Sequence, residues 1–389
     1  MIILLFALLQ GGCPEYRDDP DDGEYSGPPP ENVSLYIRTW NIPGGGKWNA
    51  AMIRGGCMSE LIIAFALINT GDYSLYISDS FPNLWNEVAA LKEQYPHLRV
   101  NISVGGGSES GLAGFSEMAG DPALRSVFTA NVCNWLETHN LDGVDIDWEY
   151  PVGPPWDSVR HLEDRENYIT LLREIRDALD ALGEQTGKRY GLSTAIPASS
   201  WFITANDVKA AAQIVDGLKL MAYDYYGDWG TPRTGHNAAL YRNPDDPANW
   251  STDQAVKAYL NAQVPPEKIV LGIAFYGQAW DNVPQGPNAN TPGLYQTGSN
   301  TKFYTTLAWS DIQKDYLKPG SGYTRYWDKT AKAPFLYNGS RWISYTDHEQ
   351  VRAITGYVKE KNLGGVFVWE YGHDMGGELL NTLARNSEQ

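Results

Sequence analysis

Short apolar segments alternate with longer amphipathic segments from residue 33 onward. The short segments are rich in β-branched and aromatic residues, which is typical of buried strands. Eight of them lie at residues 34–40, 61–67, 98–104, 143–148, 190–196, 217–223, 269–275 and 365–369. Helical periodicity is found at residues 82–94, 122–138, 163–182, 205–214, 252–263 and 348–361. This alternation predicts an α/β fold, a (β/α)8 TIM barrel, with an open doubly wound sheet as the alternative.

One interval interrupts the alternation. Residues 277–345 form a long segment rich in Gly, Asn, Thr, Tyr and Trp. A segment of this length needs structure of its own. We therefore assign residues 33–276 and 346–389 to the barrel and residues 277–345 to a small insertion domain.

The chain begins with a short apolar run, residues 1–9. This run is shorter than the roughly 18 apolar residues of a membrane-spanning helix, so we interpret residues 1–13 as a signal peptide. The Gly-Gly-Cys sequence that ends at Cys13 resembles the lipid-attachment box of bacterial lipoproteins. Residues 14–32 are acidic and rich in Pro, as expected of a solvated linker. We expect a protein that is secreted or lipid-anchored at the cell surface.

Composition narrows the class of partner. Hydrophobic residues make up 42% of the 389 residues, which predicts a sizeable core. The net charge of -17 argues against nucleic acids and anionic membranes as partners. The chain contains 14 Trp and 24 Tyr, whose flat rings suit stacking on sugar faces.

The cysteines and histidines give no metal-ligand spacing, so we expect no metal and no cofactor. Besides Cys13 the chain has Cys57 and Cys133. These two are expected to be small buried residues on different helices, with a disulfide between them as the alternative.

Three acidic residues share one face of the fourth predicted strand. Asp145, Asp147 and Glu149 alternate with apolar residues at period two, so their side chains point to the same side. Such crowding stabilises a fold poorly, but it is typical of a site that handles protons. Two adjacent buried carboxylates cannot both ionise cheaply, so Asp145 and Asp147 are expected to share a proton. A solvated edge strand is the alternative interpretation.

The same stretch carries a family resemblance. Asp142, Asp145, Asp147 and Glu149 match the Asp-x-x-Asp-x-Asp-x-Glu signature of the glycoside hydrolase family 18 chitinases. The resemblance implies that Glu149 is the general acid and later the general base. It also implies substrate-assisted catalysis, in which Asp147, relayed to Asp145, orients the acetamido group of the substrate. The product would keep its anomeric configuration.

The third predicted strand ends in Ser103-Val-Gly-Gly, which resembles the Ser-x-Gly-Gly motif of this family. The resemblance implies that Ser103 hydrogen-bonds Asp145, together with Tyr36 from the first strand. A phosphate-binding loop is the rival interpretation, and we reject it because no Gly-Lys-Ser/Thr follows the glycines.

The sixth predicted strand ends in Met221-Ala-Tyr223-Asp224, which resembles the Met-x-Tyr-Asp box of the family. The resemblance implies that Met221 packs beneath the site and that Tyr223 donates its hydroxyl to the acetamido oxygen. Asp224 would contact the sugar. By alternation alone, Met221 and Tyr223 could instead fill the barrel interior.

The seventh predicted strand ends in a segment similar to Phe-Tyr-Gly-Arg of the family, with Gln278 in place of the usual Arg. We expect a changed sugar subsite there, with Tyr276 and Trp280 as sugar contacts. Residues 277–345 resemble the α+β insertion of many family members, which forms one wall of the cleft.

The tryptophans differ in their expected roles. Trp369, which ends the eighth strand, matches the tryptophan that floors the subsite of the cleaved sugar in this family. Trp229 and Trp201 lie in predicted loops and are weaker candidates for outer subsites. Trp40 and Trp148 are expected in the core.

The resemblance implies a chitinase that binds chitin or N-acetylglucosamine oligosaccharides. We expect a monomer with no protein partner and no nucleic acid partner. One alternative is an endo-β-N-acetylglucosaminidase that acts on glycans or peptidoglycan. The other is a non-catalytic chitin-binding lectin on the same barrel. The choice between endo and exo action stays open at this point.

Overall fold

A computed structural model describes residues 23–157, 161–227, 232–300 and 307–387. The predicted signal peptide, the lipid-attachment site at Cys13 and Trp229 lie outside the described residues. Within these ranges, no helix is long and apolar enough to span a membrane. Cys57 and Cys133 are both free and lie in different helices, the short 3-10 helix Gly55–Cys57 and α4 (Pro122–Thr138).

Eight parallel strands close into a barrel. Strand β1 pairs with β15 on one side and with β2 on the other, so the sheet has no open edge. The predicted (β/α)8 barrel is confirmed, and the open doubly wound sheet is excluded. In the order of the sheet, the strands are β1 (Val33–Arg38), β15 (Gly365–Trp369), β8 (Ile269–Ala274), β7 (Gly217–Met221), β6 (Gly191–Pro197), β5 (Gly143–Asp147), β4 (Arg99–Gly105) and β2 (Glu60–Ile68). A short strand, β3 (Leu75–Tyr76), adds antiparallel to β2.

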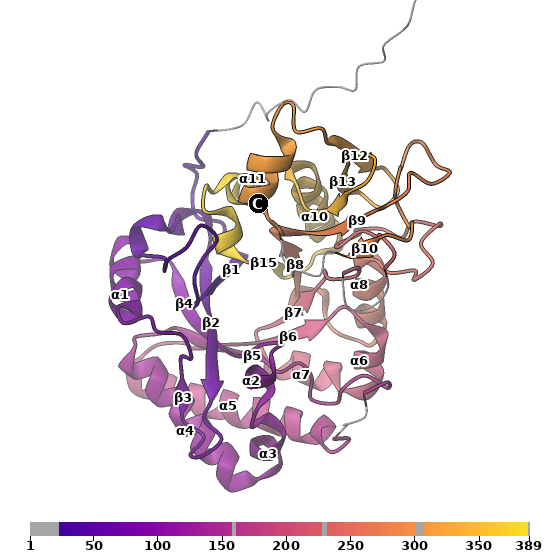
Figure 1. Ribbon diagram of the computed structural model, residues 1–389. Coiled ribbons are helices and arrows are strands. Elements are labelled where there is room, and N and C mark those ends of the chain that lie inside the picture. Colours follow the sequence, from indigo (N-terminus) through magenta and orange to yellow (C-terminus); the bar gives the residue numbers. More distant parts are fainter. Residues whose placement is uncertain (1–22, 158–160, 228–231, 301–306, 388–389) are drawn as a thin grey trace, which may run out of the picture.

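Helices cover the outside of the barrel (Figure 1). Those that the sequence predicts are α1 (Leu84–Gln94), α4, α5 (Asp164–Thr186), α7 (Val208–Ile214), α8 (Thr252–Asn261) and α10 (His348–Lys361). The start of α4 shows why these boundaries are readable, since Pro122 occupies the first turn and the Asp121 carboxylate accepts the N–H groups of Ala123 and Leu124. The sequence analysis missed α2 (Glu109–Leu112), α3 (Phe115–Gly120), α6 (Ser200–Ala205) and α11 (Glu378–Ser387).

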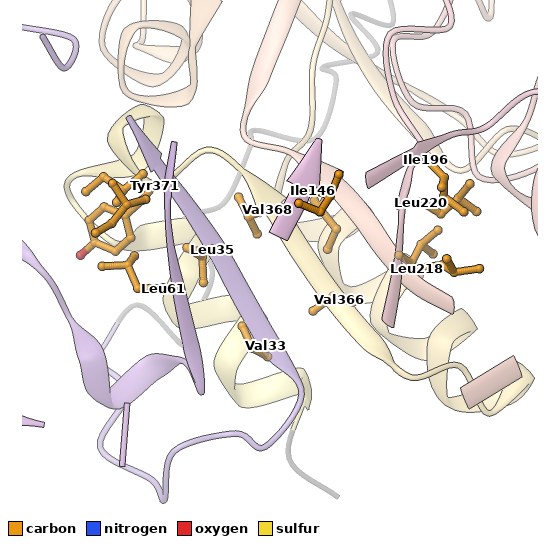
Figure 2. Close-up of a cluster of buried hydrophobic side chains, with 14 of the residues drawn as sticks. Val33, Leu35, Leu61, Ile146, Ile196, Leu218, Leu220, Val366, Val368 and Tyr371 are labelled. Atoms are coloured by element: carbon orange, nitrogen blue, oxygen red, sulfur yellow. The ribbon is translucent and has the colours of Figure 1, made fainter. Parts of the chain in front are cut away.

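The main core lies between the barrel strands and these helices. Val33, Leu35, Leu61, Val366 and Val368 point outward from their strands, and each is 2% exposed or less. Figure 2 shows how they gather around β1 and β15. The residues between them point into the barrel, so the strands are buried on both faces. This burial keeps the strands rigid, including their carboxyl ends. The active sites of such barrels lie at these ends.

A second, antiparallel sheet occupies the long interval after β8. Its strands are β9 (Tyr276–Asp281), β10 (Ser299–Asn300), β11 (Leu307–Ala308), β12 (Thr324–Asp328), β13 (Ala333–Tyr337) and β14 (Trp342–Ser344). A single helical turn, α9 (Trp309–Asp311), follows β11. The sheet has its own apolar cluster, which includes Trp280, Phe335 and Trp342.

Candidate active site

A cavity of about 330 Å³ lies at the carboxyl ends of the barrel strands. It brings together residues from β1, β2, β5, β6, β7 and β15 and from the loops that follow β4, β5 and β7. The lining residues are Tyr36, Phe65, Gly107, Asp147, Glu149, Ala195, Met221, Tyr223, Asp224, Phe367 and Trp369. The sequence analysis missed four of these, namely Phe65, Gly107, Ala195 and Phe367.

Asp145 is the deepest of the three acids and is fully buried. Its Oδ2 accepts hydrogen bonds from the Tyr36 hydroxyl at 2.7 Å and the Ser103 hydroxyl at 2.8 Å, so both predicted contacts are present. Its Oδ1 accepts a third from Ser193 at 2.6 Å, which the sequence analysis missed. Ser103 is itself fully buried. It therefore holds Asp145 in place from behind and does not line the cavity.

Asp147 lines the cavity above Asp145 and is 5% exposed. Burial raises the pKa of its carboxyl well above the usual value, and the charges of Glu149 and Asp145 raise it further. Its Oδ1 has no hydrogen-bond partner within the described part of the chain. The raised pKa favours the protonated form of Asp147, and its Oδ1 is a buried polar atom beside the cavity.

Gly105 allows the acidic strand to sit this close to β4. Its φ is +122°, a region that favours glycine. A Cβ at this position would lie 2.1 Å from the carbonyl oxygen of Asp147. The next residue, Gly106, donates its N–H to that same oxygen at 2.9 Å. The glycines of the Ser-x-Gly-Gly motif thus fix the backbone of Asp147.

Glu149 follows β5 and lines the cavity, where it is half-buried. Burial raises the pKa of Glu149 to about 7. A hydrogen bond with Tyr150 works in the opposite direction, and the charge of Asp224 raises the pKa as well. A Cβ on Gly107 would lie 3.0 Å from Oε1 of Glu149, so glycine leaves room for the carboxyl group. A carboxyl group with a pKa near 7 can donate a proton at neutral pH.

Tyr223 and Asp224 lie just beyond the end of β7, which ends at Met221 and not at residue 223 as predicted. Both line the cavity. Burial, followed by the charge of Asp224, raises the pKa of Tyr223 well above its usual value, so its hydroxyl stays a donor. Asp224 accepts a hydrogen bond from Tyr276 at 2.6 Å.

Trp369 ends β15 as one member of an aromatic stack. Its ring lies 5.6 Å from that of Phe65 at an interplanar angle of 18°, and Phe65 stacks in turn on Trp40 at 6.2 Å. Phe65 reaches the cavity because the register of β2 shifts between Ala64 and Ala66, and such a bulge redirects a side chain. Trp40 is half-buried in this stack, so its assignment to the core was wrong.

The sequence model of the family described as glycosyl hydrolases family 18 matches residues 32–374 of this chain. The chain belongs to this family. Chitinase A1 of Niallia circulans is 39% identical over 77% of this chain, which covers 44% of that relative's length. A family 18 N-acetylglucosaminidase from Paenibacillus barengoltzii has a similar structure, with a TM-score of 0.79, 32% identity and coverage of 92% and 99% of the two chains. A class V chitinase from Nicotiana tobaccum in complex with NAG4 gives a TM-score of 0.80 at 27% identity, with coverage of 92% and 99%.

Three predicted sugar contacts lie elsewhere in this family 18 chain. Trp280 is fully buried and packs edge-on against Trp342 at 5.5 Å inside the insertion sheet, so its assignment to the sugar site was wrong. Tyr276 is 3% exposed and contacts Asp224, which makes it a support for that residue. Gln278 pairs with Ser344 between β9 and β14 and does not line the cavity.

Other predicted residues also lie outside the cavity. Trp148 is buried against Phe115, with ring centroids 5.1 Å apart, as expected of a core residue. Trp201 packs edge-on against Tyr150. Asp142, the first acid of the family 18 signature, accepts hydrogen bonds from Lys92 at 2.6 Å and the Val100 N–H at 2.8 Å. Its role is therefore to anchor the strand.

The pKa of Glu149 predicts the alkaline limit of activity. If Glu149 must carry a proton, kcat/KM is expected to fall about tenfold per pH unit above pH 7, because the protonated fraction falls at that rate. Initial rates on a soluble oligosaccharide, measured over a series of pH values, give this alkaline limb of the pH–rate profile. In Asp224→Asn, one charge that raises the Glu149 pKa is removed, so the limb is expected at lower pH. A rate that stays constant to pH 9 would contradict the assignment.

Proposed function

We propose that this chain is a chitinase that hydrolyses β-1,4 bonds between N-acetylglucosamine units with retention of configuration. The observation that carries the proposal is the pairing of two acids with raised pKa values beside one cavity. Burial raises the pKa of Glu149 to about 7 and that of Asp147 well above its usual value, and the Oδ1 of Asp147 has no hydrogen-bond partner among the described residues. The names of the relatives, chitinase A1 and the class V chitinase in complex with NAG4, support chitin as the substrate class.

In the proposed reaction, the protonated Glu149 donates its proton to the glycosidic oxygen, and the bond from that oxygen to the anomeric carbon breaks. The acetamido oxygen of the same sugar attacks the anomeric carbon and forms an oxazolinium ion. Glu149, now a carboxylate, then takes a proton from water as the water opens this ion. The product keeps its configuration because the anomeric carbon is inverted twice.

Asp147 and Tyr223 would hold the acetamido group for this attack. The Oδ1 of Asp147 is the acceptor for the acetamido N–H, and the hydroxyl of Tyr223 is the donor for the acetamido oxygen. Both side chains line the cavity, and burial keeps the Tyr223 hydroxyl protonated. The acetamido nitrogen becomes positively charged as the oxazolinium ring forms. Asp147 would offset this charge by releasing its proton toward Asp145. Electrostatic groups fixed in advance in this way stabilise a transition state strongly.

Trp369 would form the floor beneath the sugar that is cleaved. Its ring is half-buried and lines the cavity, and Phe65 packs against it at 5.6 Å. An aromatic face held rigidly by a second ring suits the apolar face of a pyranose.

An N-acetylglucosaminidase is the second candidate, favoured by the name of the Paenibacillus barengoltzii protein. The same acids would serve either activity. The products separate the two, because a chitinase releases short oligomers from a soluble N-acetylglucosamine hexamer and an exo-acting enzyme releases single sugars. An endo-β-N-acetylglucosaminidase would instead cleave an N-glycan and leave the hexamer intact.

Proton NMR of early products tests the proposed chemistry. With a soluble N-acetylglucosamine oligomer, the β-anomer is expected first, and the α-anomer is expected later by mutarotation. Glu149→Gln is the control and should give neither. An α-anomer as the first product would contradict retention. Binding of the oligomer without cleavage by the unmodified protein would indicate a lectin.

A further inference from the structure

A buried ion pair crosses the barrel beneath the acidic strand. Lys219 points inward from β7, and Glu60 points inward from the start of β2, four strands away around the barrel. The Lys219 Nζ lies 3.1 Å from Oε2 of Glu60, and the two residues are 3% and 7% exposed. Asn101 donates its side-chain N–H to the other oxygen of Glu60. Neither charged residue lines the cavity.

This pair is connected to Asp145 through Ser193. The Lys219 Nζ donates to the Ser193 hydroxyl at 3.0 Å, and Ser193 donates to Oδ1 of Asp145 at 2.6 Å. An ammonium group can only donate hydrogen bonds. The oxygen of Ser193 must therefore accept from Lys219, which leaves its hydrogen to point at Asp145.

We infer that Lys219 is a positioning residue for the proposed reaction, acting through Ser193 to keep a hydrogen bond aimed at Asp145. An oriented donor favours the charged form of Asp145, so the single proton of the acid pair stays on Asp147. Asp145 is then ready to accept that proton when the acetamido nitrogen becomes positive. This inference rests on the proposed function, because it concerns the pair that would serve the acetamido group.

Among the charged groups near Asp145 and Asp147, Lys219 is the one suited to orient the donor. The titratable and charged groups near Asp145 and Asp147 within the described chain are Tyr36, Glu60, Glu149, Tyr150, Tyr168, Lys219, Tyr223 and Asp224. Lys219 is the one cation in this set. The inward residues of β8 and β15, Val270 and Phe367, carry no charge. Burial works to raise the pKa of Glu60, but the charges of Lys219 and Arg99 and hydrogen bonds from Ser34 and Lys219 together lower it below its usual value, which favours the ionised form.

The test is the acid limb of the kcat–pH profile of Lys219→Met in the full chain. Without the directed donor, the acid pair is expected to take up its second proton at a higher pH. The acid limb is expected to move up by about one pH unit, with kcat about tenfold lower at the acid end and KM changed less than about twofold. A structural role alone would not move this limb.

Four further variants isolate the connection. Lys219→Met leaves Glu60 buried without its partner, which is destabilising, so Lys219→Met is also combined with Glu60→Gln, and the shifted limb is expected to persist. Ser193→Ala is expected to produce the same shift, with no further shift in combination with Lys219→Met, because both break one connection. Lys257→Met removes a surface ion pair with Asp253 and should leave the profile unchanged.

An unmoved acid limb in the folded Lys219→Met/Glu60→Gln protein would overturn the inference. Shifts of Lys219→Met and Ser193→Ala that simply add would overturn it as well. Failure of the proposed function is a different result, since the unmodified protein would then give no β-anomer from the oligomer.

Discussion

Glu149→Gln is expected to lower kcat by about a thousandfold, because glutamine has the shape of the acid but no proton to donate. Below pH 7, binding of an N-acetylglucosamine oligomer is expected to stay within about threefold of the parent, since the aromatic floor and Asp147 are unchanged and a neutral group then occupies position 149 in both proteins. Initial rates and calorimetric titration measure the two effects. Glu137→Gln, an exposed position on α4, is the matched control.

Stability separates a catalytic role of Glu149 from a structural one. Its pKa is raised from the usual 4.5 to about 7 in the folded protein, so the ionised form disfavours folding: stability falls as the pH rises from 4.5 to 7, and the full cost is present at pH 8. Glutamine removes this cost. The Tm of Glu149→Gln at pH 8 is therefore expected to equal or exceed that of the parent. A lower Tm with lost binding would mean that Glu149 supports the fold, and the assignment of the acid would fail.

Asp147→Asn is expected to lower kcat by about a hundredfold or more, with a small change in KM. Asparagine can still accept the acetamido N–H, but it cannot lose a proton as positive charge develops on that nitrogen. Steady-state rates on a soluble oligomer measure the loss. The Glu149 proton remains available in this variant, so the loss would report on acetamido assistance.

Asp142→Asn is the matched control for Asp147→Asn, because it changes another acid of the same signature. Asp142 pairs with Lys92 outside the cavity, so its replacement is expected to reduce Tm and to leave kcat unchanged. Near-normal activity of Asp147→Asn would count against acetamido assistance. It would favour a mechanism in which another group attacks the anomeric carbon.

The sequence by itself determined the barrel and the acids at its mouth. Both follow from local periodicity: strands of a parallel barrel are buried on both faces, and alternate residues point to the same side. That rule placed Asp145, Asp147 and Glu149 on one face. The family signatures then pointed to Tyr223 and Trp369, which line the same cavity as Asp147 and Glu149.

Only the tertiary structure decided which distant residues meet. Phe65 enters the cavity because a register shift in β2 breaks the alternation. Trp280 is buried in the second apolar cluster because the strands of the insertion sheet pack around it. Lys219 and Glu60 meet because the barrel closes and brings opposite strands face to face. Period-two alternation tells which side of a strand a residue occupies, but the partner across the barrel depends on closure and register, which are set by contacts between segments far apart in the chain.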